Sequence, residues 1–155
     1  MAFILVANGV WRQANRADQG AKAEETIGHD LNSLQRSGWH IEYGRRFPLV
    51  GDVDIICRSP QGQVFAIDVK SHHGTVVHNR GQLRRQVGNS QYPFEKDFLG
   101  QVKRQAVQLK EADDYSYVTP VLVFSSAKVN VSGSQAGNVY VVARQDLRSL
   151  LLDRG

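Results

Sequence analysis

The chain has 155 residues, 41% hydrophobic and 22% charged, with a formal net charge of +4. These values predict one folded domain over 1–155 that buries its own core. No apolar run approaches the roughly 18 residues of a membrane span, and MAFILVANG lacks the basic segment of a signal peptide. The single cysteine, Cys57, excludes a disulfide framework, so we expect a cytoplasmic protein without a membrane partner.

The first predicted element is a helix over 17–36. Ile27, Leu31 and Leu34 recur at i, i+4 and i+7, and a glycine follows the pattern as a stop signal. Glu24 lies three residues before Ile27 and seven before Leu31, so we expect it to extend their buried stripe. An acid in that place requires a partner.

Strands are predicted next, over 39–47, 50–58 and 63–70, with a shorter one at 75–78. The sequence Ser-Pro-Gln-Gly between the second and the third is typical of a type I turn. Residues 80–92 are polar, basic and contain glycine, which predicts a loop.

The second half of the chain is predicted to contain a helix over 94–111, a buried strand over 118–126, a strand over 138–143 and a helix over 145–153. The order of the main elements is therefore αβββαββα. This order predicts an α/β fold with a mixed central sheet and helices on both faces.

Charged residues interrupt two of the predicted strands. Asp68 and Lys70 fall on one face of their strand, roughly 7 Å apart, because alternate side chains share a face. Asp52 and Asp54 likewise share a face of the preceding strand, and the hairpin brings the two pairs of side chains together. Carboxylates buried side by side repel each other unless a cation lies between them, and Mg²⁺ suits one or two carboxylates plus a phosphate. A structural salt bridge of Lys70 with Asp68 or Asp54 at the sheet edge explains the same residues.

Basic residues concentrate in one segment. Between 71 and 110 there are seven Lys or Arg and two acids, whereas the rest of the chain is nearly neutral. Such a segment is typical of a polyanion partner, although a run of charge is also typical of a solvated face.

At this point the residues resemble a known family. Asp54, a hairpin of about a dozen residues and then Asp68-Val69-Lys70 are similar to the signature of the PD-(D/E)XK nuclease superfamily. More narrowly, residues 20–126 resemble the nuclease-related domain (NERD) family in the stretches GAKAEETIGHDLNSL, GDVDIICRSPQGQVFAIDVKSHHG and GQVKRQAVQLK before VTPVLVFS. The resemblance implies a restriction-endonuclease-like αβββαβ core over about 17–126, with 127–155 as a C-terminal strand and helix.

The resemblance also implies a site and a chemistry. It implies a Mg²⁺ ion, with Mn²⁺ as a substitute, held by three acids and one carbonyl, namely Glu24, Asp54, Asp68 and Val69. It implies Lys70 as the catalytic lysine and Gln101 as a further site residue, although a solvent-facing role explains Gln101 equally well. Phosphate contacts are expected from five basic residues of the segment, namely Arg80, Arg84, Arg85, Lys103 and Arg104.

The expected function is a metal-dependent nuclease that hydrolyses phosphodiester bonds, of DNA rather than RNA, largely without regard to sequence. Two alternatives stay open: a catalytically silent nucleic-acid-binding module on the same fold, and a protein-interaction domain whose acids and lysine are structural. The sequence leaves open endo- against exonuclease action, the number of metals, a homodimer that cuts both strands, and the roles of His72 and His73.

Overall fold

The structure is a computed structural model, and it describes residues 20–155 of the chain. Its centre is a six-stranded mixed sheet, the main sheet, with the strand order β1-β2-β3-β7-β10-β9. The strands are β1 (His40–Arg45), β2 (Val53–Arg58), β3 (Val64–Lys70), β7 (Thr119–Phe124), β10 (Val139–Ala143) and β9 (Gln135–Ala136).

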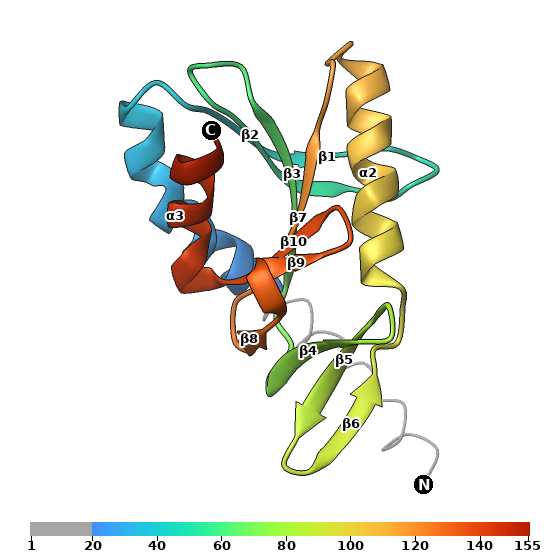
Figure 1. Cartoon of the computed structure of the whole chain (residues 1–155). Helices are drawn as coiled ribbons and strands as arrows, with labels where there is room; N and C mark the ends of the chain where they lie inside the picture. Colours follow the sequence, from blue (N-terminus) through green and yellow to red (C-terminus); the bar gives the residue numbers. More distant parts are fainter. Residues whose placement is uncertain (1–19) are drawn as a thin grey trace, which may run out of the picture.

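Three helices cover the main sheet (Figure 1). The first helix is described from residue 20 and ends at residue 36, and it lies beside α3 (Arg144–Arg154) on one face. α2 (Phe98–Ala112) covers the opposite face. None of the helices in the described part of the chain is long and apolar enough to cross a membrane.

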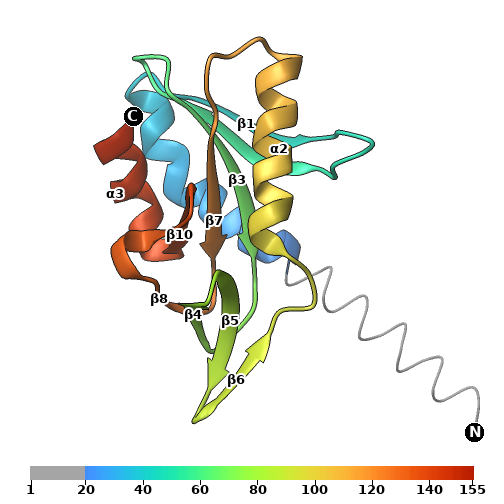
Figure 2. The same cartoon turned by 45° about the vertical axis from the view of Figure 1, so that its right-hand side comes forward.

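A second sheet, the small sheet, has the strand order β6-β5-β4-β8 and extends beyond one end of the main sheet (Figure 2). Its strands are β4 (Thr75–Asn79), β5 (Gln82–Val87), β6 (Ser90–Pro93) and β8 (Lys128–Asn130), and a 3₁₀ turn, η1 (Ser132–Ser134), follows β8. β4, β5 and β6 are an insertion into the connection from β3 to β7, because they lie in the chain between β3 and α2, whereas β8 follows β7.

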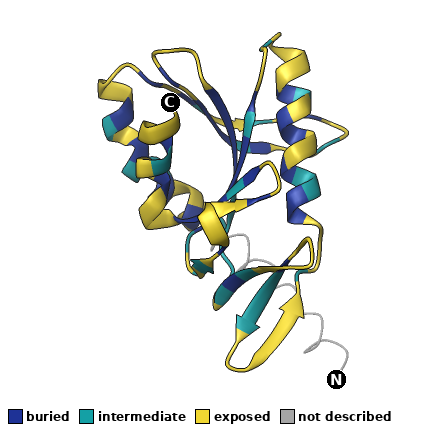
Figure 3. Ribbon diagram, viewed as in Figure 1, coloured by how far each residue is buried: buried dark blue, intermediate teal, exposed yellow. Residues whose placement is uncertain are grey.

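The core lies on both faces of the main sheet, and β3 is buried throughout Val64–Asp68 (Figure 3). On one face, residues of the first helix and α3 pack against β2, β3 and β7: Ile27, Leu31, Leu34, Leu147, Leu151, Ile55, Phe65, Ile67 and Val121. On the other face, α2 packs against β2 and β3 through Ala106, Leu109, Ile56, Val64 and Ala66. This burial on both faces explains the continuous apolar runs of β3 and β7.

Most of the predicted elements are confirmed, and the differences lie at their ends. The predicted helix over 94–111 begins only at Phe98, because the Asp97 side chain accepts a hydrogen bond from Gly100 N and caps the helix there. The turn at 59–62 is confirmed by a hydrogen bond from Gly62 N to Ser59 O. The start of the first predicted helix, 17–19, lies outside the described residues.

The predicted loop over 80–92 is wrong, because β5 and β6 occupy most of it. Arg80 and Gly81 connect β4 to β5 with φ angles of 51° and 78°, and a two-residue hairpin turn requires this conformation. Gly88 and Asn89 make the next two-residue connection, to β6. β6 is exposed along its whole length, so it lacks the apolar alternation that marks a half-buried strand.

The topology brings the carboxyl ends of the parallel strands together at one end of the main sheet. β1, β2 and β3 are antiparallel neighbours, whereas β7 is parallel to both β3 and β10. The first helix, these strands and α2 form an αβββαβ arrangement, consistent with a restriction-endonuclease-like core. Ligands of such open sheets bind where the carboxyl ends of parallel strands meet, and β3 ends there at Lys70.

Candidate active site

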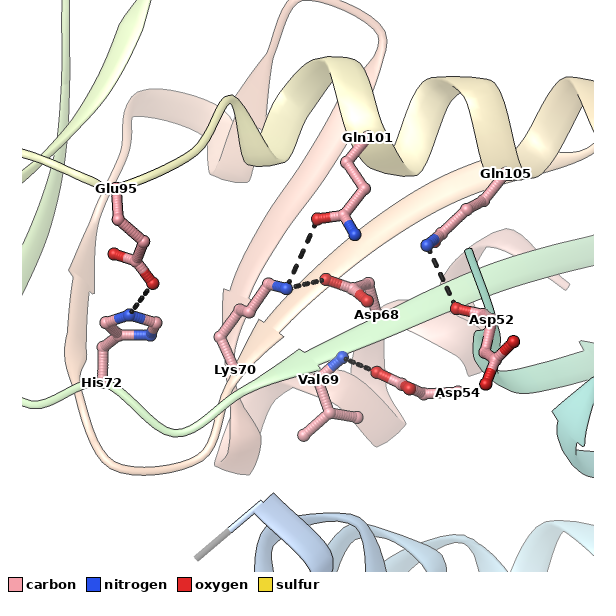
Figure 4. Close-up of polar contacts among 9 residues, drawn as sticks. All are labelled: Asp52, Asp54, Asp68, Val69, Lys70, His72, Glu95, Gln101 and Gln105. Carbon is pink, nitrogen blue, oxygen red and sulfur yellow. Dashed lines mark hydrogen bonds and ion pairs between the residues drawn. The ribbon is translucent and has the colours of Figure 1, made fainter. Parts of the chain in front are cut away.

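Asp68 and Lys70 lie at the carboxyl end of β3, on the face that α2 covers (Figure 4). They share this face with Val64 and Ala66, as strand alternation predicts. The Asp68–Lys70 ion pair of the structural alternative is present, but it lies inside the sheet and not at its edge, because β3 lies between β2 and β7. The pair is buried instead, with Asp68 only 4% exposed.

Lys70 is held by three groups on β3 and α2. Its Nζ lies 2.9 Å from Asp68 Oδ2 and 3.5 Å from Gln101 Oε1. The same ammonium lies 4.4 Å from the centre of the Phe98 ring, within the range of a cation–π contact. The position of the ammonium is therefore fixed by an acid, an amide and a ring.

Asp68 is incompletely satisfied in this arrangement. Its Oδ2 forms a 2.9 Å ion pair with Lys70 but lacks the alignment of a hydrogen bond. Besides burial, a hydrogen bond between the Asp68 and Asp54 carboxyl groups contributes to the raised pKa of Asp54. A buried carboxylate oxygen without a hydrogen bond is costly. Asp68 thus retains the capacity to bind a cation or a proton donor.

Asp54 lies on the neighbouring strand and closes the end of the β2–β3 ladder. The paired register stops at Ile55 and Ile67, and beyond it Val69 N donates a 2.8 Å hydrogen bond to Asp54 Oδ2. Burial, and then the charge of Asp68, raise the pKa of Asp54 to about 8, with a smaller contribution from Glu24. Asp54 therefore holds a proton at neutral pH unless a cation compensates its charge.

Glu24 of the first helix approaches the same carboxyl groups. Ala23, not Glu24, continues the buried stripe of Ile27, so the expected burial of Glu24 is wrong, and its side chain lies exposed beside the stripe. Partial burial raises the pKa of Glu24, a hydrogen bond with Asp54 lowers it, and the charge of Asp68 raises it. Glu24, Asp54 and Asp68 therefore interact across three separate elements of the fold.

The three acids are of the chemical type that binds a divalent cation, although their side chains do not converge on one point as the ligands of a bound metal do. No group of three His, Cys, Asp or Glu side chains within residues 20–155 has that geometry. Asp68 is turned toward Lys70, and Asp54 toward the backbone of Val69. The unsatisfied Asp68 oxygen and the raised pKa of Asp54 both indicate excess negative charge, which oxygen-seeking Mg²⁺ would compensate.

The face of α2 that meets the site is built from Phe98, Gln101 and Gln105, spaced i, i+3 and i+7. Gln105 is 1% exposed and donates a 3.1 Å hydrogen bond to the carbonyl of Asp52, which fixes the loop before β2. The Asp52 side chain is exposed and turned away, 4.0 Å from Arg46 Nε. The i, i+3, i+7 spacing places Phe98 on the same face of α2 as Gln101, and this was the sequence signal that could have indicated its contact with Lys70.

The five basic residues expected to contact phosphate are spread over three places. Arg104 and Gln101 line one cavity of about 440 Å³ beside the site, whereas the Lys103 ammonium lies against Gly137. The other three belong to the small sheet: Arg80 in the first turn, with Arg84 and Arg85 on β5. Of the five, the structure brings Arg104 beside the α2 face of the site.

His72 lies just beyond β3 and contacts the start of α2. Its Nε2 is 3.0 Å from Glu95 Oε1, and its ring packs 5.2 Å from Phe94 and 5.4 Å from Phe98, measured between ring centres. His73 instead lines a separate cavity, and its carbonyl accepts a hydrogen bond from Arg85 Nε. The two histidines, left open by the sequence, thus have different surroundings.

The fold and the acid–lysine strand are consistent with a restriction-endonuclease-like class of α/β protein. The sequence model of the nuclease-related domain (NERD) matches residues 19–125. The chain therefore belongs to the nuclease-related domain family, as the resemblance indicated. Comparisons with curated proteins and with solved structures gave no match.

Proposed function

We propose that the protein is a metal-dependent nuclease that hydrolyses phosphodiester bonds, with DNA as the expected substrate. The observation that supports this most directly is the buried, incompletely satisfied Asp68 beside Lys70 on an interior strand. A purely structural ion pair gains little from burial, because removing two charges from water costs about as much as their attraction returns. Perturbed acids gathered at one place are more typical of a functional site.

Mg²⁺ is the ion that the donor set suits. The Asp54 and Asp68 carboxylates, with Glu24 and the Val69 carbonyl, would hold it, because hard divalent ions select oxygen ligands. When bound, such an ion supplies Lewis-acid polarisation of a phosphoryl oxygen. Asp54 must release its proton before it can bind the ion, so the occupancy of the Mg²⁺ site is expected to rise with pH.

The residues of the chain position the reacting groups. Lys70, held by Asp68, Gln101 and the Phe98 ring, presents a fixed positive charge for the attacking water or the developing charge on phosphate. A charge that is already fixed needs no reorganisation during the reaction. Arg104, which lines a cavity together with Gln101, would neutralise a backbone phosphate.

The test is cleavage of single-stranded, double-stranded and branched DNA, and of RNA, with Mg²⁺, Mn²⁺ or EDTA. Lys70→Ala should abolish metal-dependent cutting and leave binding intact. Lys110→Ala is the matched control, because it removes the same charge at an exposed position in the last turn of α2. Equal cutting by the Lys70→Ala variant and the wild type would overturn the proposed role.

The open arrangement of the three acids also favours a second candidate, a silent nucleic-acid-binding module. This candidate predicts salt-sensitive binding to DNA without turnover on any substrate. A protein-interaction domain predicts weak binding with little dependence on salt. The binding titrations at two salt concentrations, run beside the cleavage assay, separate these two outcomes.

A further inference from the structure

A polar cavity of about 310 Å³ lies next to the candidate active site and is not explained by the contacts of Lys70. The first helix, the segment after β3, the segment after β7 and the start of α3 each contribute to its wall. Two cations and four hydroxyl groups line it: Lys22, Arg144, Thr26, Ser71, Ser125 and Ser126. His73 also lines it, and among residues 20–155 no carboxylate does, although Asp30 forms an ion pair with Arg144.

The chemistry of these side chains selects an anion. Hydroxyl, ammonium and guanidinium groups all donate hydrogen bonds, and charge-assisted bonds to phosphate oxygens are among the strongest in proteins. Ser125 is an exception here, because its one hydroxyl proton is already donated to the Lys70 carbonyl. Arg144 is oriented by two hydrogen bonds to Asp30, of 2.7 Å from Nε and 3.2 Å from Nη2. This pairing fixes the guanidinium plane, and Nη1 makes no hydrogen bond within the described part of the chain.

The cavity lies next to the candidate active site along the chain, although Lys70 and the three acids do not themselves line it. Ala23 lines the cavity and Glu24 is the next residue, while Ser71 lines it directly after Lys70. Ser125 makes no hydrogen bond to the three acids. Its backbone N and its Oγ both donate hydrogen bonds to the Lys70 carbonyl, at 2.9 Å and 3.3 Å. An anion held in the cavity would therefore contact residues that directly adjoin Glu24 and Lys70 in the chain.

The number of donors and the volume both favour a terminal phosphate. A phosphate monoester carries three strong acceptor oxygens and a charge near −2 at neutral pH, whereas an internal diester carries one charge and two unesterified oxygens. A volume of about 310 Å³ lies at the lower end of the roughly 300–1,000 Å³ typical of ligand cavities, which suits a phosphate with part of its sugar.

We propose that this cavity, the terminal-phosphate pocket, binds the phosphate monoester at the end of a nucleic-acid strand, so that cleavage begins from phosphorylated ends. The inference rests on the proposed nuclease function and names the substrate feature that the site selects. The same chemistry accepts a 5′- or a 3′-phosphate, and the experiment distinguishes the two.

The experiment is a binding titration in EDTA, followed by fluorescence anisotropy, with oligonucleotides that differ only at their ends. One carries a 5′-phosphate, one a 3′-phosphate and one free hydroxyls. One phosphorylated form should bind at least about tenfold more tightly than the hydroxyl form. Inorganic phosphate should remove this preference at concentrations that leave the binding of the hydroxyl form unchanged.

Two exposed residues of the pocket provide the variants, Lys22→Ala and Ser126→Ala, because both lie at the surface and leave the core unchanged. Each should reduce the preference for the phosphorylated end, Lys22→Ala to less than about twofold. Lys110→Ala, distant in the chain and outside the pocket, should retain the full preference.

Equal affinity of the wild type for all three oligonucleotides would overturn the proposal. So would an equal loss of all three in Lys22→Ala, since that pattern marks contact with internal phosphates. Because binding is measured without metal, absent cleavage leaves this test intact and counts only against the nuclease. Conversely, metal-dependent cutting of circular and linear DNA at equal rates would keep the nuclease and refute the requirement for an end.

Discussion

Replacing Asp54 by Asn should remove most of the pH dependence of stability that the metal-free protein shows between pH 5 and pH 8. Burial and the neighbouring acids raise the pKa of Asp54 from the ordinary 3.8 to about 8. Between these values the folded protein keeps a proton that the unfolded chain has lost, so the free energy of unfolding falls as pH rises. The loss between pH 5 and pH 8 is at most about 4 kcal/mol.

For a chain of this size, each kcal/mol shifts Tm by about 2–4 °C, so Tm should fall by up to roughly 15 °C over this pH range. The assay is thermal unfolding in EDTA, followed by circular dichroism, for the wild type and Asp54→Asn. Asparagine keeps an oxygen that accepts the hydrogen bond of Val69 N, but it does not titrate. Equal dependence of Tm on pH in the two proteins would refute the assignment of the proton to Asp54.

Three further predictions concern single residues. Burial raises the pKa of the Cys57 thiol to about 12. A chromogenic thiol reagent at pH 8 should therefore react with Cys57 only as fast as the protein unfolds, and rapid labelling of the native protein would contradict this burial. Asp97→Ala removes the cap of α2 and should lower the free energy of unfolding by about 1 kcal/mol in urea titrations, whereas exposed Asp153→Ala should have little effect. Gly81→Val places a β-branched residue at a φ of 78° and should cost more than about 1 kcal/mol, whereas Gly81→Asn, which tolerates that conformation, should cost less; equal losses would exclude backbone strain as the cause.

The alternation of β3 could be read from the sequence because each face of a buried strand is fixed by the residues before it. Val64 and Ala66 pack under α2, and Asp68 and Lys70 necessarily follow on that face. The place of Asp68 and Lys70 within the sheet could not be read, since the pairing of β3 with β7 joins residues more than fifty positions apart.

Glu24 shows a second limit of the sequence pattern. Positions three and four residues before Ile27 can both continue its buried stripe, and these are Glu24 and Ala23. In the structure Ala23 is the buried one. The strands β5 and β6 were missed for a different reason: the small sheet buries little of their surface, and their sequence therefore carries little apolar alternation.

The place of β10 in the main sheet has a consequence for folding during synthesis. β10 pairs with the outer side of β7, yet it is made after every other long strand, and α3 follows it to cover the first helix. Until 139–154 emerges, β7 presents an unpaired apolar edge, and the first helix lacks part of its packing. At about 5–20 residues per second this exposed state lasts on the order of a second. A nascent chain halted before β10 is therefore expected to aggregate through β7, and the protein acquires its complete fold only when synthesis has passed α3.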